Sequence, residues 1–134
     1  MRRLTYILSI FLVALLALTG NAQDKDLTTD KVRFMLQGNW VSDDSTLSMT
    51  VMGDTIIERK AGNAQADHFD YTIKKETCDP ELDKKAKGTK STGFYIDESS
   101  TYDAIEFCNM LITITNDTMV LLYTDGQVVL TKKP

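Results

Sequence analysis

The chain has 134 residues, and its 15 lysines and arginines against 19 aspartates and glutamates give a net charge of −4. This length suits one domain and leaves little room for a second. An acidic balance opposes binding to a phosphate backbone, which argues against nucleic acid as a partner.

The first 22 residues have the pattern of a secretory signal peptide. Arg2 and Arg3 precede an apolar run over residues 7–18, and the small-residue stretch Gly20-Asn21-Ala22 follows. That run is too short for a membrane-spanning helix, which needs about 20 apolar residues. We therefore predict cleavage near Ala22, a periplasmic or secreted product without a transmembrane segment, and one monomeric domain over residues 23–134.

A short helix is predicted over residues 29–37. A threonine precedes it as a cap, and Gly38 can end it in a left-handed conformation. Val32, Met35 and Leu36 fall on one face of this helix. That apolar face requires a surface to pack against.

Beyond Trp40 the hydrophobic pattern alternates with period two, as in half-buried strands, most clearly over residues 47–51 and 68–74. Gly53-Asp54, Asn116-Asp117 and Asp125-Gly126 have the composition of two-residue hairpin turns. Residues 61–67 read as a loop, and Asp79-Pro80 can cap one helical turn within the charged stretch that follows. With strands near 39–44, 91–97 and 101–108, the fold class is all-β: an antiparallel up-and-down meander of about eight strands.

Export gives meaning to the two cysteines, Cys78 and Cys108, because they meet an oxidising compartment. One intramolecular disulfide is predicted, and closing its loop would stabilise the fold by roughly 3.5 kcal/mol. The alternative is a pair of free buried cysteines. A metal site is not predicted, since the chain has one histidine and no Cys-x-x-Cys motif.

The last two turns predict a register for the C-terminal strands, in which every second residue shares a face. The face opposite the core face carries an apolar patch of Val120, Leu122 and Val129. The helix over residues 29–37 either covers this patch or closes one end of a barrel. The predicted core face consists of Ile112, Ile114, Met119, Leu121, Tyr123, Val128 and Leu130.

No catalytic motif is recognisable. The only histidine, His68, alternates out of phase with Phe69 and Tyr71, which places it on the solvent face of its strand. The chain contains neither a Gly-x-Ser-x-Gly elbow nor a His-Glu-x-x-His motif. We predict that the protein is not an enzyme and uses no cofactor.

The helical entry, Gly38-Asn39-Trp40 at the start of the first strand, and the eight-strand meander together resemble a lipocalin-like domain of exported bacterial proteins. The resemblance implies a small β-barrel in which Trp40 plugs the closed end under a basic side chain from the last strand. The predicted register gives that part to Lys132.

Two functions are compatible with such a barrel, whose interior is either filled or holds one small ligand. The first is binding of a small apolar molecule inside the barrel. The second is a secreted protein-interaction module with a filled core, whose contact surface is the Val120, Leu122 and Val129 patch. The candidates for lining a ligand pocket are Met49, Phe69, Tyr71, Met119, Leu121 and Tyr123.

Overall fold

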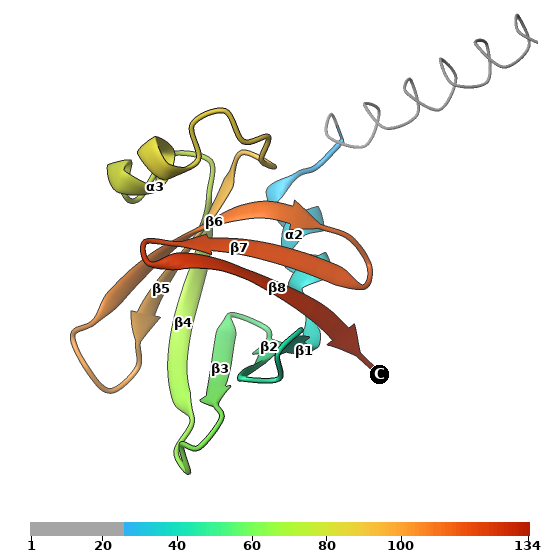
Figure 1. Cartoon of the computed structure of the whole chain (residues 1–134), viewed down its shortest axis with the longest axis vertical. Coiled ribbons are helices and arrows are strands. Elements are labelled where there is room, and N and C mark those ends of the chain that lie inside the picture. The colour runs from blue at the N-terminus through green and yellow to red at the C-terminus, as the bar shows by residue number, and fades with distance from the viewer. Residues whose placement is uncertain (1–25) are drawn as a thin grey trace, which may run out of the picture.

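The computed structural model describes residues 26–134, which form a closed barrel of eight antiparallel strands, each hydrogen-bonded to the next in the chain (Figure 1). Strand β1 also pairs with β8, and this pairing closes the barrel. The predicted all-β meander is confirmed, and the predicted signal peptide lies outside the described residues. The strands are β1 Gly38–Ser42, β2 Leu47–Met52, β3 Thr55–Lys60, β4 Asp67–Lys74, β5 Phe94–Ser100, β6 Glu106–Ile114, β7 Thr118–Tyr123 and β8 Gly126–Lys133.

Helix α2, Thr29–Leu36, closes one end of the barrel. The Thr28 hydroxyl caps it by accepting a hydrogen bond from the Lys31 backbone N–H at 3.2 Å. Gly38 follows with a φ of 120°, a conformation that favours glycine, and the chain turns there into β1. The helix buries Val32 and Leu36 in the same cluster as the inward side chains of the strands. Of the two predicted arrangements, the structure therefore has the one in which the helix closes an end.

Trp40 forms the floor of this closed end and is fully buried. Its indole Nε1 donates a hydrogen bond to the Leu36 carbonyl at 2.8 Å. Lys132 is its partner across the β1–β8 pairing, with Nζ 4.8 Å from the ring centroid, and donates to the Met35 carbonyl at 2.9 Å. Helix, first strand and last strand are thus joined around one aromatic ring.

Two of the three predicted turns are confirmed. Gly53 and Asp54 connect β2 to β3, and the backbone N–H of Thr115 donates to Thr118 at 2.8 Å across the Asn116-Asp117 turn. The third prediction is wrong by one residue, because Tyr123 pairs with Gly126 and the loop is 124–125. This changes the register by two positions, so the same side chains remain on the inner face.

The register of β6 differs from the prediction in a way that matters for the interior. Leu111, rather than Ile112, lies opposite Leu121, because the pairing shifts between Leu111 and Thr113. Such a bulge inserts an extra residue and reverses which side chains point inward. Ile112 consequently leaves the predicted core face, while Leu111 and Asn109 are buried.

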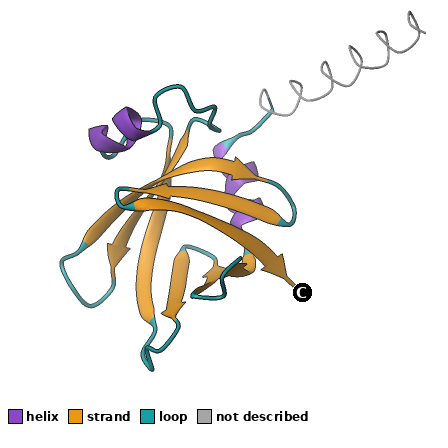
Figure 2. Cartoon of the chain, viewed as in Figure 1, coloured by secondary structure: helices purple, strands orange, loops and turns teal. Residues whose placement is uncertain are grey.

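Helix α3, Pro80–Lys85, lies outside the barrel wall (Figure 2), and a second, smaller hydrophobic cluster packs beneath it. The Asp79 carboxylate caps this helix by accepting from the Glu81 backbone N–H at 3.0 Å, as the sequence predicted. Leu82 is buried against β5 and β6. The predicted disulfide between Cys78 and Cys108 is confirmed, and it links the segment before α3 to β6 across a Cα–Cα distance of 5.7 Å.

The predicted apolar patch on the outer face is only partly covered. Leu122 packs against the α3 cluster, whereas Val120 and Val129 pair with each other on neighbouring strands and remain half-buried. Helix α2 does not lie over them, because its apolar face is in the barrel core.

Within residues 26–134, none of the helices has the length and apolar character needed to cross a bilayer.

Candidate functional site

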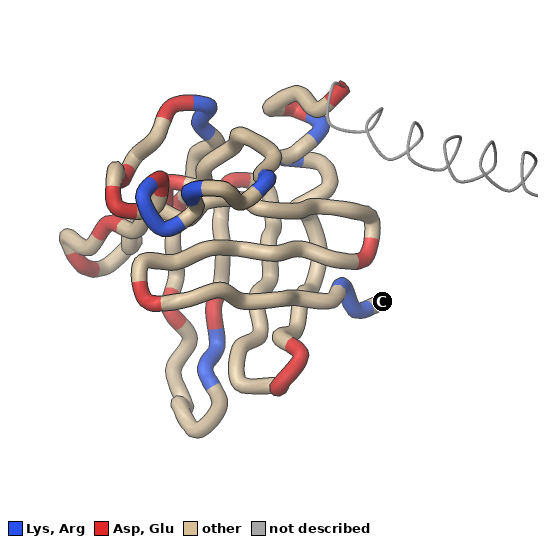
Figure 3. Tube along the Cα trace, turned by 45° about the horizontal axis from the view of Figure 1, so that its top comes forward, with Lys and Arg blue, Asp and Glu red and all other residues tan. Residues whose placement is uncertain are grey.

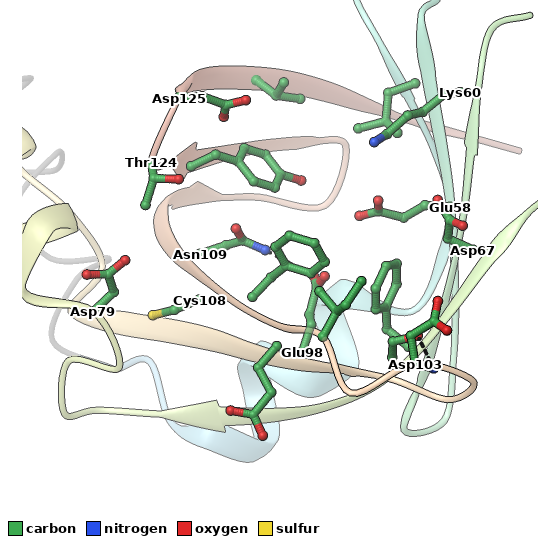
Figure 4. A pocket seen from close by; sticks show the side chains of 18 residues that line it. Glu58, Lys60, Asp67, Asp79, Glu98, Asp103, Cys108, Asn109, Thr124 and Asp125 are labelled. Carbon is green, nitrogen blue, oxygen red and sulfur yellow. Dashed lines mark hydrogen bonds between the residues drawn. The ribbon is translucent and has the colours of Figure 1, made fainter. Parts of the chain in front are cut away.

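The end of the barrel away from Trp40 contains a pocket of about 550 Å³. Its walls come from β2 to β8 and from the β5–β6 loop (Figure 4). Eight-stranded barrels have interiors just large enough for one small ligand, and a pocket of this volume lies within the range of small-molecule sites. The same strand alternation that fills the closed end with Trp40, Ile56 and Leu111 places several polar side chains here.

Four polar side chains form the inner part of the pocket: Glu58 from β3, Glu98 from β5, Asn109 from β6 and Tyr123 from β7. The exposed fractions of Glu58, Glu98 and Asn109 are 8%, 2% and 1%. Carboxylates are almost never this buried unless they are paired. In Figure 4 the Glu58 side chain extends toward the centre of the pocket, with Asn109 facing it from another wall.

Local sequence explains why the two carboxylates point inward. Ile56 is fully buried on β3, so Glu58, two residues later, shares its face. The same alternation carries Ile96 to Glu98 on β5. Both strands therefore begin as apolar inward runs near the closed end and finish with an acid near the open one.

Hydrogen bonding in this group is incomplete. The Asn109 side-chain amide donates to Glu98 Oε1 at 3.2 Å. Glu58 Oε1 and the Tyr123 hydroxyl are buried and have no hydrogen-bond partner within the described residues. A buried polar atom without a partner is costly, by roughly 1–3 kcal/mol. The inner pocket thus has acceptors that the protein itself does not satisfy.

Burial raises the pKa of all three ionisable groups. For Glu98, burial and then the charge of Glu58 raise the pKa to about 8, against the lowering effect of the Asn109 hydrogen bond. Burial also raises the pKa of Glu58, although the nearby charge of Lys60 opposes the change. The Tyr123 pKa rises for the same reasons, with burial the largest cause and the two glutamates next. Two like charges held in one apolar site disfavour double ionisation.

The outer part of the pocket combines apolar side chains with further acids. Phe69 is buried, and its ring meets that of Phe107 edge to face with centroids 5.7 Å apart. Phe107 and Ile105 are 45% and 49% exposed and form an apolar edge at the β5–β6 loop. The acids are Asp67, Asp79, Asp103, Glu106 and Asp125, against one cation, Lys60.

Charged residues occur in the turns, helices and strands around the barrel (Figure 3). Glu58 and Glu98 differ from the other charged side chains of residues 26–134 because they are buried. Their position is therefore not explained by surface solvation.

Of the six predicted lining residues, Phe69 and Tyr123 line the pocket. Met49, Tyr71, Met119 and Leu121 lie deeper and belong to the packed core. The Tyr71 hydroxyl donates to the Gly53 carbonyl at 2.8 Å, close to helix α2. The barrel is therefore filled in its lower half and open in its upper half.

Sequence reasoning did not identify Glu58, Glu98 or Asn109. A signal existed for the glutamates, since each follows a branched aliphatic residue at spacing two within a strand-like run. For Asn109 there was none, because its inward orientation depends on the bulge in β6.

His68 lies on the outer face of its strand, as predicted, and is half-buried there because the ring of Tyr102 lies edge to face against it with centroids 5.8 Å apart. It points away from the pocket residues, on the opposite face of β4 from Phe69. Across residues 26–134, no group of three or more histidine, cysteine or acidic side chains has an arrangement that could hold a metal ion.

A second hollow of about 450 Å³ lies between α2 and the β6–β7 turn. Phe34 and Met35 line it from the helix, with Phe34 79% exposed. Its lining contains no carboxylate and only one charged residue, Lys31. It lacks the buried polar groups that distinguish the pocket in the barrel.

Comparisons with protein-family models, with curated protein sequences and with solved structures found no match to this chain.

Proposed function

We propose that this protein is a non-enzymatic, exported binding protein that holds a small, largely apolar molecule in the open end of its barrel. The observation that carries the proposal is the pocket of about 550 Å³ above a tightly packed floor. Apolar burial against Phe69, Phe107 and Val128 would supply most of the affinity, at roughly 25 cal/mol per Å² removed from water.

The unsatisfied polar atoms inside the pocket also support a ligand. A few convergent polar groups in a mainly apolar recess are typical of small-molecule sites, where they orient the ligand. The alternative, an interaction module with a filled core, is disfavoured by the open upper half of the barrel. The apolar patch that such a module would use for contact is also reduced, because Leu122 is packed under α3.

The test is a pair of tryptophan substitutions on adjacent residues of β8. Val128 lines the pocket and Val129 faces outward, and both are half-buried in the free protein. Val128→Trp should fill the pocket, while Val129→Trp places the same side chain on the outer wall. Protein spanning residues 23–134 would be screened against fatty acids, retinoids, haem, apolar alcohols and apolar amines by native mass spectrometry and thermal shift.

We expect at least one compound to bind the parent protein and Val129→Trp equally, and Val128→Trp to lose that binding. If every compound leaves the parent protein unshifted, or if a bound compound tolerates Val128→Trp, the proposal is overturned.

A further inference from the structure

We infer that the ligand of the barrel carries a protonated amine, whose N–H groups are bound by Glu58 and Glu98 at the inner end of the pocket. This inference rests on the proposed function, since it names the chemical class of ligand that the same pocket accepts.

The inner pocket has free hydrogen-bonding capacity. Glu58 Oε1 and the Tyr123 hydroxyl have no partner within the described residues. Glu98 uses one oxygen to accept from Asn109, which leaves its second oxygen available. Once both glutamates are ionised they are acceptors only, so the Tyr123 hydroxyl is the one donor among these unpaired groups. The group therefore lacks donors.

An ammonium group matches this deficit. It presents three N–H donors and a compact positive charge. A neutral alcohol presents one donor, and a carboxylate ligand presents none and adds a third like charge. Among simple head groups, only a cation both supplies enough donors and offsets the charge of the two glutamates.

Burial distinguishes these two acids from ordinary surface carboxylates. Glu58 is 8% exposed and aims into the pocket (Figure 4), and Glu98 is 2% exposed. Keeping two carboxyl groups in such a position costs stability when either is ionised without a counterion. A bound cation removes that cost, so the site is stabilised by its ligand.

Lys60 is the protein's own candidate counterion for this pair. It lines the pocket and its charge lowers the pKa of Glu58. Its side chain is exposed, however, and it forms no ion pair with Glu58 or Glu98 among the described residues. The charged groups around the pair are otherwise acidic: Asp67 for Glu58, and Asp97 for Glu98.

The apolar edge determines the rest of the ligand. Phe107 and Ile105 are about half exposed and form the apolar edge of the pocket, and the buried Phe69 ring continues that surface inward from Phe107. A molecule with its amine at Glu58 would lay its hydrocarbon part along these side chains. The class is therefore a small primary amine with an apolar chain or ring.

Three probes that share one eight-carbon chain isolate the head group: octylamine, 1-octanol and octanoate. Isothermal titration calorimetry on the protein spanning residues 23–134 would compare their affinities at neutral pH. We expect octylamine to bind about ten-fold or more tighter than 1-octanol, and octanoate to bind weakest, since the charge interaction in a low-dielectric site is strong.

The variants are Glu58→Gln and Glu98→Gln, with Glu106→Gln as the matched control. Glu106 lines the same pocket but is exposed. Each inner substitution should weaken octylamine about ten-fold and leave 1-octanol nearly unchanged, while Glu106→Gln should change octylamine less than about two-fold, as expected for a screened surface charge. Thermal unfolding verifies that each variant is folded, and Tyr123→Phe, expected to weaken octylamine a few-fold, provides a second probe without a charge change.

Proton release gives an independent readout. Because the pKa of Glu98 is about 8 without ligand, ammonium binding at neutral pH should expel a proton. The binding heat should then vary with the ionisation enthalpy of the buffer, and octylamine affinity should rise as pH is raised toward 9, with no such change for 1-octanol.

The outcomes separate the two proposals. If 1-octanol or octanoate binds as tightly as octylamine, or if Glu58→Gln and Glu98→Gln leave octylamine affinity unchanged, the amine inference is overturned while a ligand pocket stands. If none of the three probes binds and no other compound in the wider screen does, the proposed function itself is overturned.

Discussion

The two ends of the barrel satisfy their polar groups to very different degrees. At the closed end Trp40, Lys132 and Tyr71 each have a hydrogen-bond partner on a neighbouring backbone. At the open end Glu58 and Tyr123 have buried atoms without one. The closed end is therefore stabilised by its polar contacts, whereas the open end leaves polar groups unpaired at the expense of stability, as the proposed binding site would require.

Gln37 shows how thorough the pairing at the closed end is. Its side-chain oxygen accepts from the Gly53 backbone N–H at 2.8 Å, and its nitrogen donates to the Gly53 carbonyl at 3.1 Å. One residue after α2 thus binds both backbone groups of a β2–β3 turn glycine. These contacts hold the helix against the β2–β3 turn of the barrel.

The largest expected effect comes from the closed end. Trp40→Ala should lower the free energy of unfolding by about 3–5 kcal/mol, because it removes a fully buried ring and leaves a cavity. Urea denaturation followed by circular dichroism measures the loss. Phe34→Ala on the exposed face of α2 is the control and should change stability by less than about 0.5 kcal/mol. Equal losses for the two would contradict the role given to Trp40.

At the open end, stability depends on a covalent link. Replacing both Cys78 and Cys108 by serine should cost roughly 3.5 kcal/mol, since the closed loop no longer restricts the unfolded chain. Urea denaturation of the parent protein with and without a reductant provides the comparison. A reduced parent protein as stable as the oxidised one would show that the barrel alone holds α3 in place.

Glu98→Gln should stabilise the protein in a pH-dependent way. The folded-state pKa of Glu98, about 8, lies above its ordinary value, so the folded protein binds more protons than the unfolded chain between these values. Stability contributed by this group is complete at acidic pH and falls as pH rises through that window.

The Glu98→Gln variant does not suffer this loss. Its free energy of unfolding should exceed that of the parent protein by about 1–3 kcal/mol near pH 9, with little difference near pH 4. Thermal unfolding across this pH range gives the measurement, with Glu106→Gln as the exposed control. The prediction would be contradicted if, between neutral and alkaline pH, the stability of the parent protein fell no more steeply than that of Glu98→Gln. A variant that gains stability and loses amine affinity would link the two properties to one side chain.

The smallest effect is expected at the cation above Trp40. Lys132→Met should cost about 1–2 kcal/mol, because the Met35 carbonyl loses its donor and the indole loses its cation. Lys133→Met, one residue along and exposed, should be nearly neutral. Urea denaturation of both variants checks the difference. Similar values for the two would mean that the Lys132 contacts contribute nothing measurable.

Much of the fold could be predicted from local pattern. Period-two alternation locates strands because successive side chains point to opposite faces, and Gly53-Asp54 locates a turn because its geometry needs a positive φ. The helix before Gly38, its threonine cap and the pairing of the only two cysteines also followed from the sequence. The strands, the turn and the helix depend on residues near one another in the chain, and two cysteines allow only one intramolecular pairing.

The candidate site was decided by tertiary structure. Glu58 and Glu98 are far apart in sequence, and only barrel closure brings them to one interior, where burial shifts their pKa values together. Asn109 reaches them because a bulge in β6 reverses the local alternation. The sequence determined which residues alternate, because alternation is a property of each strand, whereas the depth at which the core ends depends on how eight strands are staggered around Trp40.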